Sequence, residues 1–146
     1  MDISGLYWRR SRLTASQCPP GLLALDRGRL SFRTTETRVF DVPATDVAAR
    51  LTGWGSLVLA VGDTRYTLQA SVGQLSPPFS KTQRQAIDAA TRAGTLRTLR
   101  EWGPILSGAG TSVRTAPANF RRWLLGAILV ILVGAAAVAI VVNGGL

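Results

Sequence analysis

Hydrophobic and polar residues alternate along roughly the first half of the chain, with the period of two that is typical of strands with one wet face. Residues 21–32 contain two apolar runs separated by a short loop with a glycine, which predicts a hairpin. Residues 56–69 alternate on both sides of Gly62 and Asp63, which predicts a second hairpin with a two-residue turn. Further strands are expected over residues 6–13, 38–42 and 47–51.

The period of the pattern changes after residue 76. Ser80 and Gln83 have the spacing of a capping box and predict a helix start. From Ala86 to Trp102 small and apolar residues recur every three or four positions, which indicates an amphipathic helix. A Gly-Pro pair after Trp102 ends it, and Gly94 allows a bend within it.

Strands followed by one helix predict an α+β fold. We expect an antiparallel curved sheet or partial barrel of about seven strands, capped by the C-terminal helix, in a domain over residues 1–102. Leu99 and Trp102 are predicted to fill the core. Residues 103–119 are rich in Gly, Ser, Thr, Ala and Pro, and predict a flexible linker.

The C-terminal part of the chain has a different pattern again. Residues 123–142 contain no charged side chain, and a helix of this length spans the ~30 Å hydrocarbon core of a bilayer. A single membrane-spanning helix is therefore predicted over residues 120–142. Its expected interface residues are Phe120, Arg121, Arg122 and Trp123. The arginines before the span predict a cytoplasmic N-terminal domain in the cell membrane, with residues 143–146 outside.

The arginines of the chain and the small residues of the predicted span indicate which partners the protein could contact. The net charge of +9 is carried almost wholly by scattered arginines, so a bilayer surface is a more natural partner than nucleic acid. Arg9, Arg10 and Arg12 in the first predicted strand are candidate contacts with lipid or a protein partner. The same arginines also fit a solvated strand with a charge-protected edge. Three small residues of the span are candidates for contact with a second copy in a homodimer: Gly134, Ala135 and Ala139.

The chain offers little catalytic chemistry. It has no histidine and one cysteine, Cys18, so neither a zinc cluster nor a Cys–His pair is available. We therefore expect no enzyme activity, no cofactor and no metal. If carboxylates did carry chemistry, Asp41, Thr45 and Asp46 would be the first candidates, although their sequence context also fits a turn between strands.

Three stretches resemble a known family: GLLALDRGRLSF (residues 21–32), VFDVPATDV (39–47) and LVLAVGDTRYTL (57–68). They are similar to bacterial pleckstrin-homology-like and GRAM-like domains, and in particular to small actinobacterial membrane proteins in which such a domain precedes a single span. The resemblance implies seven strands with a capping C-terminal helix. It also implies a non-catalytic module that binds lipid headgroups, peptides or proteins at a membrane.

Three functional hypotheses follow. The first is a membrane-tethered interaction or scaffold module that presents a cytoplasmic surface to a protein or to anionic lipid. The second is an accessory or regulatory subunit of a larger membrane complex that functions in transport or in the cell envelope. The third is a carboxylate-dependent enzyme.

Overall fold

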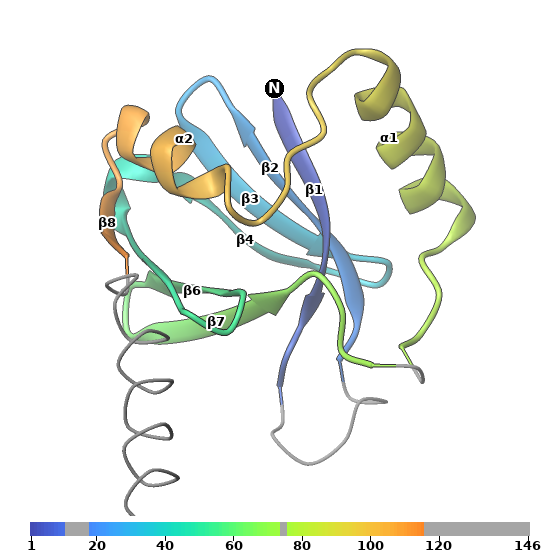
Figure 1. Ribbon diagram of the computed structural model, residues 1–146, viewed down its shortest axis with the longest axis horizontal. Coiled ribbons are helices and arrows are strands. Elements are labelled where there is room, and N and C mark those ends of the chain that lie inside the picture. Colours follow the sequence, from blue (N-terminus) through green and yellow to red (C-terminus); the bar gives the residue numbers. More distant parts are fainter. Residues whose placement is uncertain (11–17, 74–75, 116–146) are drawn as a thin grey trace, which may run out of the picture. The chain divides into compact units, whose positions relative to one another are not determined.

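Eight strands form one continuous mixed sheet in the order β4-β3-β2-β1-β7-β6-β5-β8 (Figure 1). This computed structural model describes residues 1–10, 18–73 and 76–115. The strands are β1 (Asp2–Trp8), β2 (Pro20–Asp26), β3 (Arg29–Thr34), β4 (Arg38–Pro43), β5 (Val47–Leu51), β6 (Ser56–Val61), β7 (Thr64–Gln69) and β8 (Ser112–Thr115). A single 3₁₀ turn, η2 (Ala44–Asp46), links β4 to β5.

Both predicted hairpins are confirmed. Between β2 and β3, Arg27 and Gly28 both have positive φ, 48° and 75°, as a two-residue turn that matches the strand twist requires. Between β6 and β7, Gly62 has a φ of 56°, a conformation that glycine adopts without steric cost. The chain therefore turns back twice through tight hairpins at the places where the alternation is interrupted.

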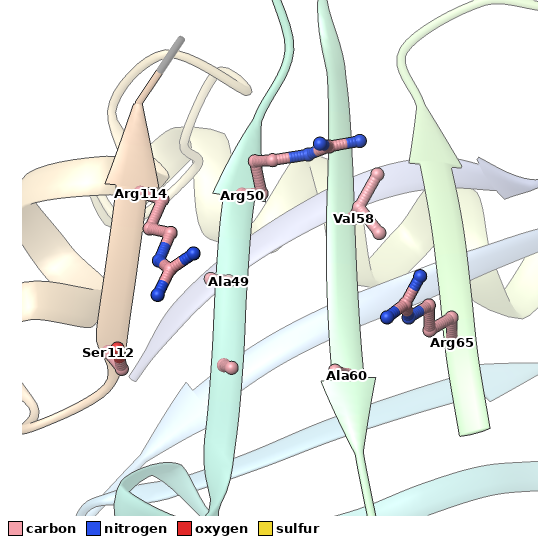
Figure 2. Close-up of a pocket in the computed structure, with 8 residues that line it drawn as sticks. Ala49, Arg50, Val58, Ala60, Arg65, Ser112 and Arg114 are labelled. Carbon is pink, nitrogen blue, oxygen red and sulfur yellow. The ribbon is translucent and has the colours of Figure 1, made fainter. Parts of the chain in front are cut away.

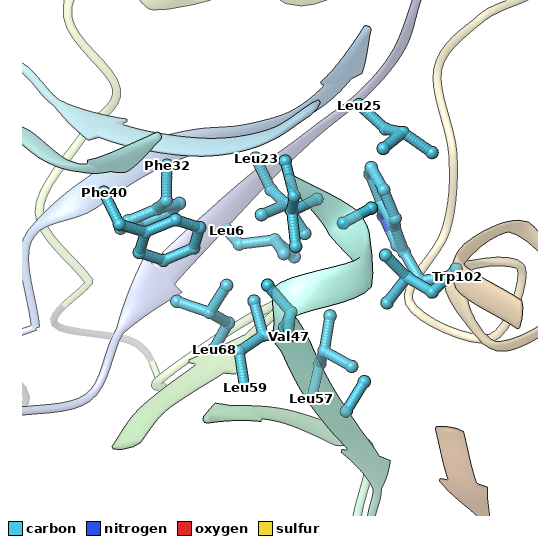
Figure 3. Close-up of a cluster of buried hydrophobic side chains, with 14 of the residues drawn as sticks. Leu6, Leu23, Leu25, Phe32, Phe40, Val47, Leu57, Leu59, Leu68 and Trp102 are labelled. Carbon is cyan, nitrogen blue, oxygen red and sulfur yellow. The ribbon is translucent and has the colours of Figure 1, made fainter. Parts of the chain in front are cut away.

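The inner face of the curved sheet holds the main core (Figure 3). Phe40 of β4 and Tyr66 of β7 have ring centroids 5.0 Å apart, although β3, β2 and β1 lie between their strands in the sheet order. The sheet is thus strongly bent, but it does not close into a barrel. Trp102 and Leu99 lie in this core, as predicted, with exposures of 0% and 8%.

Two helices cover different parts of the sheet. Helix α1 (Lys81–Arg92) begins with the predicted capping box and packs on the outer face of β1 and β2. Its Ala90 is buried against Ile3 and Leu22. Helix α2 (Trp102–Gly108) places Trp102 and Leu106 in the main core.

The α+β class is confirmed, but two details of the prediction are wrong. The sheet has eight strands and is mixed, because β8 pairs with β5 in parallel. The single predicted helix is two helices, since the chain turns at Gly94 with a φ of 66°. The segment between the helices then bonds to β1: the Ile3 amide donates to the Thr95 carbonyl, and the Arg97 amide donates to the Ile3 carbonyl.

The predicted domain end at residue 102 also differs from the structure. Helix α2 and strand β8 occupy most of residues 102–115, and one unit extends over Met1–Thr115. The composition of this segment is linker-like, yet its backbone is held by pairing with β5 and by the buried Thr111 hydroxyl, which donates to the Ala44 carbonyl at 2.8 Å. The rest of the predicted linker and the predicted span lie outside the described residues. Within the described residues, no helix has the length and apolar character needed to cross a membrane.

Candidate functional site: an arginine-lined face of the sheet

The outer face of β7, β6, β5 and β8 is lined by side chains that alternate away from the core. Leu57 and Leu59 of β6 point into the core, whereas Val58 and Ala60 point outward. The same alternation turns Arg50 of β5 outward. Helix α1 packs on β1 instead, so this part of the sheet keeps an outer face built from small residues and arginines.

A hollow of about 290 Å³ lies on this face (Figure 2). It is lined by Ala48, Ala49, Arg50, Val58, Ala60, Arg65, Ser112 and Arg114. Figure 2 shows that the Arg50 side chain crosses β6 from β5, that the Arg65 side chain extends from β7 toward β6, and that Arg114 lies between β8 and β5. Three separate strands thus bring three guanidinium groups to one hollow with a floor of small side chains.

Two of these arginines are direct neighbours in the sheet. Arg50 and Arg114 are register partners in the parallel pair of β5 and β8. Like charges placed opposite one another across strands destabilise a sheet. No carboxylate lines the hollow, and within the described residues no ion pair joins Arg50, Arg65 or Arg114 to an acid. The positive charge of this hollow therefore lacks compensation from the described part of the chain.

Arginines elsewhere on the domain differ in this respect. Asp41 accepts from the Arg29 Nε atom at 3.0 Å and from an Arg38 terminal nitrogen at 3.1 Å. The Arg97 Nε atom lies 2.6 Å from an oxygen of Asp2. Two acids of this domain, Asp2 and Asp41, thus pair with arginines that lie outside the hollow.

A second hollow of about 470 Å³ adjoins the first, since Val58 lines both. Its lining residues are Arg9, Arg10, Thr52, Trp54, Ser56, Val58, Thr67 and Gln69. The Arg10 guanidinium carbon lies 4.1 Å from the ring centre of Trp8, a cation–π contact. Trp54, in the loop between β5 and β6, is 82% exposed. We call the two hollows together the basic face; its arginines are Arg9, Arg10, Arg50, Arg65 and Arg114.

The sequence prediction found part of this face. Arg9 and Arg10 line the second hollow, although they follow β1, which ends at Trp8, and do not lie within it. Arg12, the four predicted interface residues (Phe120, Arg121, Arg122, Trp123) and the three small residues of the span (Gly134, Ala135, Ala139) lie outside the described residues.

Sequence reasoning missed Arg50, Arg65 and Arg114. The outward position of Arg50 and Arg65 in alternating strands was a usable signal. For Arg114 the sequence contained no such signal, because this residue lies in a segment whose composition predicts a linker. Only the parallel pairing of β8 with β5 places Arg114 beside Arg50.

The carboxylates proposed for the enzyme hypothesis occupy a turn and a strand. Asp41 bonds to two arginines, and Asp46 accepts a hydrogen bond from the Thr45 hydroxyl at 3.2 Å in the turn η2. The turn η2 has no side-chain cap hydrogen bond. Within residues 1–10, 18–73 and 76–115, no group of three His, Cys, Asp or Glu side chains is placed to hold a metal ion.

Comparisons of this chain with protein-family models, with curated proteins and with solved structures found no match.

Proposed function

We propose that this protein is a membrane-tethered interaction module in which residues 123–142 span the bilayer and the folded domain faces the cytoplasm. The observation that carries the proposal is the basic face, where Arg50 and Arg114 are adjacent and the described part of the chain places no carboxylate in their hollow. An arrangement that costs stability in the free domain is expected to be retained where an anionic partner compensates it. That partner is the bilayer surface or an acidic protein.

The resemblance to pleckstrin-homology-like domains supports the same proposal. Strands β1 to β7 pair as antiparallel neighbours, apart from the step from β4 to β5, and a C-terminal helix inserts Trp102 into the core. A run of antiparallel strands followed by a helix supports the resemblance, which implies seven strands and a capping helix. The additional strand β8 adds Arg114 to the open face.

Two measurements test this function. In cells that produce the full chain, it should stay with the membrane fraction after extraction at alkaline pH, which removes peripheral proteins. Crosslinking of native membranes followed by mass spectrometry should then give crosslinks from the β5–β8 face to lipid or to a reproducible protein partner. Release of the chain by alkaline extraction would rule out the tether. Crosslinks confined to other faces would rule out the basic face as the binding surface.

A further inference from the structure

We infer that the basic face docks on the anionic surface of the same bilayer that residues 123–142 are proposed to span. This inference rests on the proposed function and adds which side of the domain faces the membrane. It also names one occupant of the face, a sheet of lipid phosphates rather than an acidic protein.

The distribution of charge favours an extended partner. The arginines of the basic face come from β5, β7, β8 and the segment after β1, and the two hollows adjoin at Val58. Guanidinium groups bind phosphate oxygens through paired hydrogen bonds. Because the positive charge is spread over several strands, many phosphates at once compensate it better than one small anion in one hollow does.

Trp54 gives independent support. Its ring is 82% exposed and lines the hollow that contains Arg9 and Arg10. A large aromatic ring that is exposed to water gains no stabilisation from burial, but rings of this kind are enriched at the level of lipid headgroups. A tryptophan beside arginines on an otherwise small-residue face is the combination expected of a surface that touches a bilayer.

The position of β8 in the chain distinguishes the bilayer from a protein partner. Strand β8 carries Arg114 and ends at Thr115. Only residues 116–122 separate it from the apolar run, and a chain of that length reaches at most about 25 Å, whatever its course. A surface this close is present at a high effective concentration, so weak attractions suffice to hold it. An acidic protein has no such tether.

The expected size of the effect follows from the arginine count. Each arginine near an anionic headgroup layer favours the docked state about fivefold. Replacing Arg50, Arg65 and Arg114 by glutamine should therefore lower the ratio of docked to undocked domains about a hundredfold. A control variant removes the same charge elsewhere: Arg84, Arg92 and Arg100 are exposed and line neither hollow.

The experiment uses the full chain in lipid nanodiscs. One set contains phosphatidylcholine alone, and the other contains phosphatidylcholine with an equal amount of phosphatidylglycerol. A fluorophore is attached at Ala60→Cys, on the floor of the first hollow, in a Cys18→Ala background. A reference fluorophore is attached at Asp88→Cys, exposed on α1. Nitroxide groups on the lipid headgroups quench either dye when it approaches the bilayer.

Docking predicts that quenching at position 60 exceeds quenching at position 88 in anionic discs but not in neutral discs. Added salt should reduce the difference. The Arg50/Arg65/Arg114 variant should lose it, and the Arg84/Arg92/Arg100 variant should keep it. Circular dichroism and thermal unfolding of each variant show whether the fold is retained, so a loss of quenching is not mistaken for unfolding.

The other outcomes are distinct. Equal quenching of position 60 in neutral and anionic discs, or an equal loss in both triple variants, overturns the docking inference. If the chain enters the discs but position 60 stays unquenched, docking fails while the membrane tether stands. A protein crosslink that depends on Arg50, Arg65 and Arg114 would then assign the face to an acidic protein. If the chain does not enter the discs at all, the proposed function fails as well.

Discussion

Arg50 of β5 and Arg114 of β8 face each other as register partners of a parallel strand pair, and no carboxylate of the described residues lines the hollow that they share. A second arginine pair, Arg33 with Arg38, exists in the sheet, but there Arg38 is bonded to Asp41. The pair at the β5–β8 edge is therefore the one whose repulsion the described residues leave uncompensated.

Removing one member of this pair should stabilise the free domain. Arg114→Gln is expected to raise the free energy of unfolding by ~0.2–1 kcal/mol at low salt, because the like-charge repulsion disappears. Denaturant unfolding of the full chain in neutral detergent measures the change. Arg100→Gln, which removes an exposed charge outside both hollows, is the control and should change stability by less than ~0.5 kcal/mol. A loss of stability in Arg114→Gln would contradict the repulsion.

The buried bond between Trp102 and Ser4 should matter for stability. The Trp102 Nε1 group donates to the Ser4 hydroxyl at 2.7 Å, and that hydroxyl donates to the Arg97 carbonyl. Ser4→Ala would leave a buried N–H without an acceptor, and is expected to cost ~1–3 kcal/mol. Ser31→Ala, on the outward side of β3, should cost less than ~0.5 kcal/mol. Equal changes in the free energy of unfolding for the two substitutions would contradict a stabilising role of the buried bond.

Gly21 should not tolerate a side chain. A Cβ atom at Gly21 would lie 2.4 Å from the Phe32 ring and 2.7 Å from the Arg33 carbonyl oxygen. The carbonyl belongs to the neighbouring strand and cannot move without breaking the pairing of β2 with β3. Gly21→Ala is expected to destabilise the domain by ~1–3 kcal/mol. Gly53→Ala, with no atom within 4 Å of the added carbon, should be neutral within ~0.5 kcal/mol, and thermal unfolding compares the two.

Gln83 links the start of α1 to the sheet. Its side chain accepts from the Ser80 amide at 2.9 Å and donates to the Pro20 carbonyl at 3.0 Å. Gln83→Ala removes both bonds and is expected to cost ~1–3 kcal/mol. Gln85→Ala, an exposed position of the same helix, should change little, since alanine has the better helix propensity. Hydrogen exchange of the α1 amides should report the difference; equal protection in both variants would contradict the role of Gln83.

Glu101 should contribute to the pH dependence of stability. The Thr98 amide, and then the Thr98 hydroxyl, donate to its carboxylate and lower the pKa of Glu101 below the ordinary 4.5. Because the folded pKa is the lower one, this contribution is full above pH 4.5 and is lost as the pH falls through the folded pKa. An NMR titration of the Glu101 carboxyl carbon measures the pKa directly. A value at or above 4.5 would contradict the role of the two hydrogen bonds.

The local elements of this fold could be predicted because local residues determine them. The Gly62-Asp63 turn and the Ser80–Gln83 capping box depend on residues only a few positions apart, and both appear as expected. Leu99 and Trp102 were recognised as core residues from their helical spacing, although neither lies within α1 and only Trp102 lies in α2. Residue type and spacing thus identified what is buried better than they identified where helices end.

The features that the sequence did not predict depend on pairing between residues that are far apart in the chain. Nothing in the composition of residues 112–115 distinguishes a strand from a linker, and β8 exists because β5 offers a free edge to it. For the same reason the basic face was only partly found, since its central arginine pair joins positions far apart in the sequence. The break of the predicted helix likewise reflects the pairing of Ile3 with Leu96, two residues that most of the domain's sequence separates.

The central place of β1 has a consequence for how the domain is made. The first strand pairs with β2 and β7, bonds to residues 95–97 and supplies the Ser4 hydroxyl to Trp102. Its partners are thus synthesised from the beginning to nearly the end of the domain. The strands that are synthesised first keep unpaired edges until these late residues have been synthesised. Folding is therefore slow, and the nascent chain is prone to aggregation. A chain that stops before residue 102 should therefore be degraded rather than accumulate as a smaller folded protein.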